Sequence, residues 1–237
     1  RLGCSMAELS LLIEAIISGL FVGGFYGICA IGLTMVFGVM RIINFAQGDL
    51  VMIGMYITYW LFALYGVDPY ISIIITFSVL FAIGMLLQRF LVSRILKSPD
   101  SHKVLLTFGL SLVLQNMALL LWQTDYRVVT TEYSGWTYKF GFIIIGFTRL
   151  VAFTSALALT IVLYIFLNKS RMGKALRATA QNREAAMSMG INVDRIYVIT
   201  FGMAAALAGI AGCAISPFYY VFPTLGKSIG IMALIIV

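Results

Sequence analysis

Apolar runs long enough to cross a lipid bilayer constrain this chain more than any other feature. A helix needs about 20 mostly apolar residues to span the hydrocarbon core. The stretches 70–87, 104–122, 150–167 and 196–216 each approach that length, and 62% of all residues are hydrophobic whereas only 11% are charged. We therefore expect an all-α polytopic membrane protein, a bundle of transmembrane helices in contact with the lipid bilayer.

The first apolar region, residues 9–40, is longer than one span requires. Either one long tilted helix or two segments broken near Gly23 fits it. Small residues recur at about every fourth position here and again within 196–216: Gly19, Gly23, Gly27, Ala30, Thr34 and Gly38, then Ala205, Gly209 and Cys213. Because this spacing lets helix backbones approach closely, we expect these ridges to be packing surfaces.

Polar residues interrupt the apolar pattern between residues 41 and 49, where the chain reads Arg-Ile-Ile-Asn-Phe-Ala-Gln-Gly-Asp. A short apolar piece, residues 50–65, follows. Irregular backbone at membrane depth is tolerated only where it is buried in protein or lines a cavity. The residues alone leave two interpretations open: a broken helix inside the bundle, or an ordinary turn between two spans.

The distribution of charge predicts which loops share a side of the membrane. The formal net charge is +7, and the positive residues collect in the intervals 89–103 and 168–195 instead of along one surface stripe. Both intervals should be cytoplasmic by the positive-inside rule, so that 66–69 and 123–148 face outward. We expect no nucleic-acid partner.

The outward interval is rich in aromatic residues and mixed in charge. Two of its stretches, Val128–Thr131 and Phe140–Phe147, are rich in β-branched and aromatic residues. This composition is typical of short strands, so we expect a small external hairpin.

The longest polar interval, 168–195, contains the pattern of a short helix after Asn182. Asn182 can cap that helix, Glu184 places a negative charge in its first turn, and Gly190 supplies the stop. A helix of about two turns is not stable alone in water. It needs a surface against which to bury one face, formed by Ala185, Ala186 and Met189. A solvated inter-helix loop and a docking helix for a soluble partner both fit.

Few residues of this chain can carry catalysis or bind a metal ion. His102 is the only histidine, and the three cysteines have no paired spacing. No carboxylate pair lies within the spans, and no Ser-His-Asp set can be assembled. We therefore expect no catalytic residues, no metal site, and no cofactor bound by this chain.

Two motifs resemble those of a known family. Glu184-Ala-Ala186, followed by Gly190, resembles the cytoplasmic coupling loop of ABC-importer permeases. The stretch 43–56 is similar to a motif of the branched-chain amino acid permease family, whose members usually carry Asn-Phe-Ala-His-Gly-Glu where this chain has Gln47 and Asp49. The resemblance runs from about residue 20 to residue 237, and the two motifs occur in the family's order.

The resemblance implies a permease subunit of a binding-protein-dependent ABC importer, which translocates branched-chain or related amino acids across the bacterial inner membrane. The implied partners are ABC ATPase subunits that hydrolyse ATP, a periplasmic substrate-binding protein, and a second permease subunit, identical or different. The residues implied in ATPase coupling are Glu184, Ala185, Ala186 and Gly190. We also expect Asn44, Gln47, Gly48 and Asp49 to border the substrate path, because backbone N–H groups freed where a helix begins near Asp49 can hydrogen-bond a polar substrate. The alternative is a structural role, in which Asn44 and Gln47 satisfy the broken helix ladder.

On this interpretation residues 1–237 are a single transmembrane permease domain, with 168–195 as its cytoplasmic coupling loop. Because the chain stops inside an apolar run, we expect further C-terminal helices to be missing. Urea and amide permeases share much of this pattern and remain an alternative. A channel or carrier outside the ABC class would favour ionisable relay residues within the membrane. Only Glu14, Arg41 and Asp49 come near.

Overall fold

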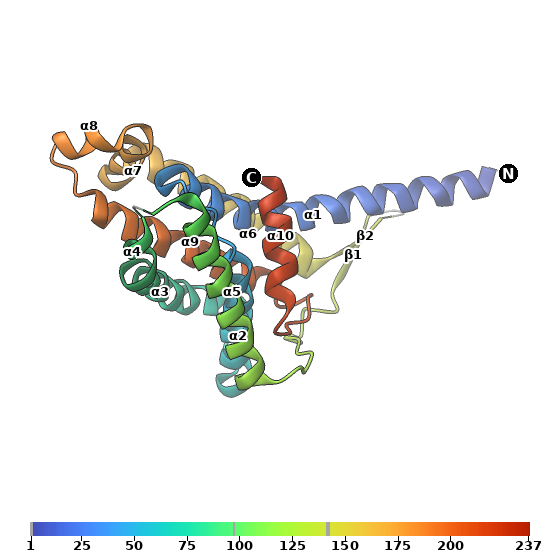
Figure 1. The fold of residues 1–237 in the computed structure, drawn as a ribbon. Coiled ribbons are helices and arrows are strands. Elements are labelled where there is room, and N and C mark those ends of the chain that lie inside the picture. Colours follow the sequence, from blue (N-terminus) through green and yellow to red (C-terminus); the bar gives the residue numbers. More distant parts are fainter. Residues whose placement is uncertain (1, 97, 141–142) are drawn as a thin grey trace.

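The structure is a computed structural model that describes residues 2–96, 98–140 and 143–237. Most of them are helical, as Figure 1 shows. The helices are α1 Leu2–Met40, α2 Gln47–Tyr65, α3 Pro69–Leu87, the π-helical turn η1 Gln88–Val92, α4 Ser93–Ile95, α5 Asp100–Trp122, α6 Phe147–Lys169, α7 Arg171–Gln181, α8 Arg183–Ser188, α9 Val193–Ile215 and α10 Leu225–Ile236. The strands are β1 Thr137–Phe140 and β2 Ile143–Gly146.

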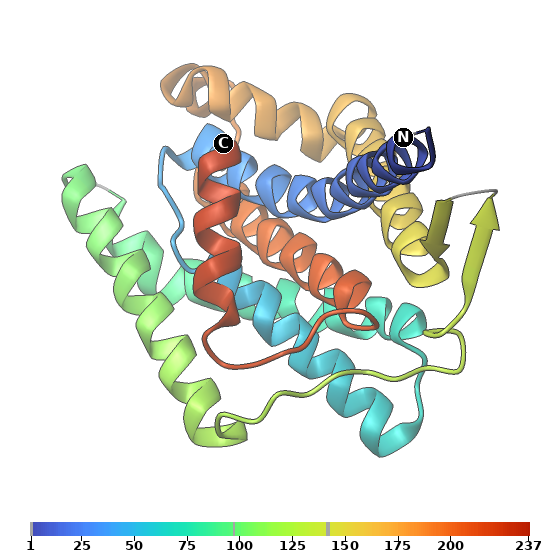
Figure 2. The same ribbon diagram turned by 90° about the vertical axis from the view of Figure 1, so that its right-hand side faces the viewer.

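Helix α9 occupies the centre of the bundle. It is buried without interruption from Ala204 to Ile215 and packs against α1, α2 and α3. Figure 2 shows it in orange-red between α1 (blue) and α2 (light blue). A Cβ on Gly84 of α3 would lie 2.7 Å from the Cβ of Ala205, and one on Gly54 of α2 would lie 2.8 Å from the Cα of Gly209. The ridge predicted in 196–216 is therefore confirmed as a packing surface.

Helix α1 is a single helix of 39 residues, so the unbroken alternative holds for residues 9–40. The prediction that its ridge of small residues is a packing surface is wrong at the glycines. A Cβ would meet no neighbouring atom within 4 Å at any of Gly19, Gly23, Gly27 and Gly38. The close approaches involve Gly24, where a Cβ would lie 2.8 Å from the Phe153 ring of α6, and Gly32, where one would lie 3.1 Å from the Ala204 carbonyl oxygen.

The first basic interval is more helical than predicted. Helix α3 continues beyond Leu87 through η1 into α4 and ends at Ile95, so Arg89 and Arg94 lie on helical turns. The apolar pattern persists there, and Val92 is fully buried, which gives the extra turns a packing partner. Helix α5 then begins at Asp100, before the predicted start of its span.

The hairpin predicted in the outward interval is present, but with different strands. β1 and β2 pair antiparallel, with Thr137 opposite Gly146, and α6 begins at Phe147. The segment 128–131 forms no strand. Next to it, Arg127 exchanges two main-chain hydrogen bonds with Val221, of 3.1 and 2.7 Å. The β-branched run therefore lies beside the chain leading to α10 and is not part of the hairpin.

The loop after α5 is also tied to the turn between α2 and α3. The Tyr133 hydroxyl donates a 2.6 Å hydrogen bond to Asp68 Oδ2. Burial and the Asp68 carboxylate raise the pKa of Tyr133 above its usual range, so the hydroxyl remains a donor at neutral pH. The turn 66–69 and the interval 123–148 thus meet at one end of the molecule.

Six helical segments within the described residues are long and apolar enough to cross a membrane: 11–40, 47–65, 69–95, 100–122, 147–169 and 193–215. Several of them are buried along only one stripe and expose large apolar side chains elsewhere. A soluble protein rarely exposes so much apolar surface. The prediction of an all-α polytopic membrane protein is confirmed.

Candidate functional site

A polar break between α1 and α2 lies inside the bundle. Helix α1 ends where Arg41 adopts the left-handed conformation (φ 53°) and donates its N–H to the Phe37 carbonyl. Asn44 and Gln47, in and just after the break, are each 1% exposed. The sequence left a buried break and an ordinary turn as alternatives, and the structure has the buried break.

Two side chains hold this break together. Asn44 Oδ1 accepts the N–H of Ala46 at 3.2 Å, and Asn44 Nδ2 donates to Gln47 Oε1 at 3.3 Å. Gln47 Nε2 donates in turn to the Ala204 carbonyl of α9 at 3.1 Å. Because buried polar groups are costly without partners, this network explains why amide side chains occupy these two positions.

Asp49, in the first turn of α2, is not part of the Asn44–Gln47 network. It is fully buried, and Gln115 of α5 donates from Nε2 to Asp49 Oδ1 at 3.0 Å while lying 3.0 Å from Ser111 Oγ. Asp49 Oδ2 has no hydrogen-bond partner among the described residues. Ionisable groups at such positions in membrane proteins are costly and usually functional.

Helix α10 crosses the start of α2 at very short range. A Cβ on Gly48 would overlap the Gly226 carbonyl and lie 2.7 Å from the Cα of Gly230. A Cβ on Gly226 would in turn overlap Asp49. Glycine at both positions, Gly48 of α2 and Gly226 of α10, therefore allows α10 to cover the Asp49 carboxyl group.

The second candidate region is the helical pair α7–α8. The sequence did not predict α7, because its many cations suggested a loop. Ser170 Oγ caps it by accepting the Gly173 N–H at 2.8 Å. Gly173, Leu176 and Thr179 form a buried face, and the helix packs on α6 and α1.

The prediction for α8 is confirmed in its local structure. Asn182 Oδ1 accepts the N–H groups of Glu184 and Ala185, both at 3.0 Å. Gly190 follows the helix with φ 82°, a conformation that L-residues with a side chain rarely adopt.

The predicted apolar face of α8 is split in the structure. Ala186 is 3% exposed and packs into the protein itself, whereas Met189 is 82% exposed. Glu184, Ala185 and Met187 also face outward. Ala186 therefore anchors α8 to the bundle, and the outward side chains are those available to another protein.

The Ala186 anchor belongs to a buried cluster that reaches the polar break. Its members are Val36, Met40, Ile42, Val92, Ala186, Val193, Tyr197, Phe201 and Ala204. The Ala204 carbonyl accepts the Gln47 hydrogen bond. One packed unit thus joins α8, the end of α1 and the break before α2.

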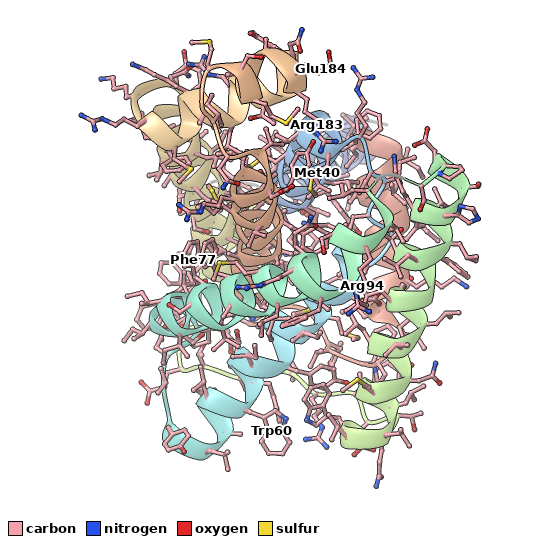
Figure 3. The ribbon with its side chains drawn as sticks, turned by 60° about the vertical axis from the view of Figure 1, so that its left-hand side comes forward. Met40, Trp60, Phe77, Arg94, Arg183 and Glu184 are labelled. Carbon is pink, nitrogen blue, oxygen red and sulfur yellow. The ribbon has the colours of Figure 1, made fainter. Side chains whose placement is uncertain are left out.

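The cytoplasmic intervals predicted from charge lie side by side. A polar pocket of about 620 Å³ is lined by Arg41, by Asp100 and Lys103 of α5, and by Arg183 and Glu184 of α8. Lys103 Nζ lies 2.8 Å from Asp100 Oδ1. Figure 3 shows Arg183 and Glu184 near Met40, where α1 ends.

Sequence reasoning did not find Ser111 and Gln115, although a signal was present. Thr107, Ser111 and Gln115 recur every fourth residue on a mostly apolar helix, and all three are buried. This polar stripe is the face that α5 turns toward α2 and the break.

Six helical segments fit to cross a membrane, arranged around a buried polar break, define the class: a multi-pass transmembrane protein. Residues 15–237 match the family described as branched-chain amino acid transport system / permease component, and the chain belongs to this family. It is the permease component of a transport system and a multi-pass protein of the inner membrane. Permeases of this family work with ATPase and binding-protein components.

Curated relatives cover most of the chain. It is 30% identical over 246 residues to the high-affinity branched-chain amino acid transport system permease protein BraD of Pseudomonas aeruginosa, spanning 96% of this chain and 78% of that protein. It is 31% identical over 248 residues to LivH of Salmonella typhimurium (93% and 76%), and 28% identical over 205 residues to a probable LivH of Methanocaldococcus jannaschii (84% and 65%). No solved structure matches the chain significantly.

Proposed function

We propose that this chain forms the translocation path of an ABC importer for branched-chain or related amino acids. The observation that carries the proposal is the α7–α8 pair, in a chain whose relatives are named as branched-chain amino acid permeases. Helix α8 is capped at both ends, held by one buried alanine, and presents Met187 and Met189 outward. Such a helix suits the groove of a partner protein.

The proposed division of labour leaves the chemistry to other subunits. The chain is a single transmembrane domain that catalyses no reaction and binds no cofactor or metal. Separate ATPase subunits hydrolyse ATP and contact the coupling residues Glu184, Ala185 and Gly190, with Ala186 as their anchor. A periplasmic binding protein delivers the substrate, and a second permease subunit, identical or different, completes the path.

Reconstitution tests this function directly. Proteoliposomes that hold the permease with its ATPase subunits should accumulate labelled leucine only when ATP is enclosed and the liganded binding protein is supplied outside. Excess unlabelled isoleucine should compete, whereas urea and acetamide should not. Uptake that continues without ATP would instead support a channel or carrier.

The basic segments should lie on the cytoplasmic side. In a background that lacks the native cysteines, Ser101→Cys at the start of α5 and Gly135→Cys before β1 place thiols at exposed positions. An impermeant maleimide added to intact cells should label Gly135→Cys alone, and permeabilisation should add Ser101→Cys. Labelling of both variants in intact cells would contradict this orientation.

We propose that the break borders the substrate path. Asp49 faces the path, Gly48 lets α10 pack at its border, and Asn44 and Gln47 hold its shape. Asp49→Asn keeps the size of the side chain and removes its charge. It should lower ATP-driven uptake by about tenfold, equivalent to ~1.4 kcal/mol, at normal membrane abundance. Gln47→Leu should mainly lower abundance, because it leaves the buried Asn44 Nδ2 without its acceptor. Uptake by Asp49→Asn at the wild-type rate would remove Asp49 from the path.

A further inference from the structure

An aromatic cluster lies toward the C-terminal end of α2, away from the break. The ring of Tyr56 stacks on that of Trp122 of α5, with centroids 3.9 Å apart and planes inclined by 16°. One turn further along α2, Trp60 lies with its ring centroid 5.1 Å from Arg127 Cζ, and Tyr59 lies with its centroid 5.4 Å from the same atom. Figure 3 shows Trp60 beside the lower ends of α2 and α5.

Two hydrogen-bond donors in this cluster lack an acceptor in the described part of the chain. The Tyr56 hydroxyl and Trp60 Nε1 are buried and have no partner among the described residues. The whole Tyr56 side chain is inaccessible, at 0% exposed. A buried donor without a partner costs free energy that phenylalanine would avoid at the same position, so packing alone does not account for these two residues.

The backbone of Arg127 is fixed, whereas its guanidinium group makes only long polar contacts. Its backbone is fixed by the pair of hydrogen bonds with Val221. Its Nη2 lies 3.5 Å from both the Trp122 carbonyl oxygen and Asp125 Oδ2, at the outer limit of hydrogen bonding. Since a guanidinium carries five N–H donors in a rigid fork, most of these donors have no acceptor among the described residues.

We propose that Tyr56, Trp60 and Arg127 form a carboxylate-binding subsite, which receives the carboxylate of the amino acid during its passage. All three groups are donors, one is permanently cationic, and arginine pairs with carboxylates through two parallel hydrogen bonds. The inference rests on the proposed function and narrows it, because urea and simple amides have no carboxylate to offer.

A free amino acid fits this subsite better than the surface of the binding protein does. The Tyr56 hydroxyl and Trp60 Nε1 lie below the surface, where a side chain of a docked protein does not reach. Helix α5 is buried along one stripe only, Thr107, Leu110, Ser111, Gln115 and Ala118. Moving α5 away from α2 therefore opens the subsite to a small molecule without disturbing the packing around α9.

The test separates substrate passage from protein docking. In proteoliposomes with the ATPase subunits, leucine uptake is measured against the concentration of leucine-loaded binding protein. Tyr56→Phe and Arg127→Gln should each lower the maximal rate by about tenfold and leave the half-saturating concentration of binding protein unchanged. Tyr59→Phe is the matched control. This change removes a hydroxyl from a neighbouring ring, and that hydroxyl is not one of the two buried donors without an acceptor. The Tyr59→Phe variant should therefore transport at the wild-type rate.

Two results would overturn the subsite. A wild-type maximal rate for Tyr56→Phe would mean that its hydroxyl meets no substrate. A raised half-saturating concentration at an unchanged maximal rate would make the cluster a docking surface. Failure of the wild-type protein to transport leucine would refute the proposed function itself, so the two failures are distinguishable. Membrane abundance of each variant, measured by immunoblot, separates loss of protein from loss of rate.

Discussion

Replacing Met189 with aspartate is expected to abolish uptake while the permease remains folded in the membrane. The Met189 side chain is 82% exposed, so the substitution removes little contact within the protein. In the proposed complex it enters an ATPase groove, where an unpaired buried charge is strongly unfavourable. A contact of this kind is typically worth ~2–4 kcal/mol, a weakening of roughly 30- to 1,000-fold.

The measurement is co-purification of the ATPase subunits with the tagged permease, together with uptake. Ser101→Asp, at an exposed position at the start of α5, is the control and should retain both ATPase binding and uptake. Met189→Asp that still binds the ATPase would show that the outward face of α8 is not the contact.

Ala186→Glu provides an instructive contrast. The coupling motif suggests that this change acts on the partner, but Ala186 is packed inside the protein against the cluster that contains Tyr197 and Phe201. Glutamate there should release α8 from the bundle and alter the structure of the permease itself. Limited proteolysis should cut the segment that follows residue 181 faster in Ala186→Glu than in the wild type, and should not do so in Met189→Asp.

The largest effect on stability is expected from Gly212→Val. A Cβ on Gly212 would overlap the Val51 carbonyl of α2 and lie 2.9 Å from the Met55 nitrogen. Both are backbone atoms of α2, which packs against α9, and they cannot move aside as a flexible side chain does. The cost should reach or exceed ~3 kcal/mol, the upper end of ordinary overpacking penalties. That is a large part of a typical folding free energy of ~5–15 kcal/mol.

Gly23→Val is the matched control, because a Cβ on Gly23 would meet nothing within 4 Å. Its effect should stay within ~0.5 kcal/mol, as for other surface substitutions. Unfolding in increasing SDS, followed by tryptophan fluorescence, compares the two variants. Equal midpoints would mean that the α2–α9 approach contributes nothing to stability.

The sequence predicted the spans because membrane-crossing helices depend on composition over about 20 residues, and no distant contact is needed to recognise them. The caps of α8 were predictable for a similar reason. Asn182 and Gly190 act on backbone groups within a few residues of themselves.

Which face a helix turns inward could not be predicted in the same way. The glycine ridge of α1 has the right spacing, yet the helix packs through Gly24 and Gly32, a face offset from the ridge. Ala186 and Met189 share one face by spacing, but only Ala186 meets the bundle. Both outcomes depend on where α6, α9 and the end of α1 lie, which is information from distant parts of the chain.

The polar residues of the site show the same limit. Asn44, Gln47 and Asp49 stand out because they interrupt an apolar region, but their different roles depend on partners far along the chain. Gln47 meets Ala204 and Asp49 meets Gln115. Arg127 is only one charge in a mixed loop of the sequence, because its aromatic neighbours come from α2.

The central position of α9 also sets the order of events during synthesis. Helices α1, α2 and α3 leave the ribosome first, yet the helix they share is made much later. The hydrogen bond from Gln47 to the Ala204 carbonyl forms only after α9 has been inserted. The same holds for the contact between the Thr58 hydroxyl and the Cys213 sulfur, 2.9 Å apart. Because synthesis adds about 5–20 residues per second, Gln47 and Thr58 remain without these partners for on the order of ten seconds. The contacts that α1, α2 and α3 make with α9 therefore form late in synthesis, after all three helices are already in the bilayer.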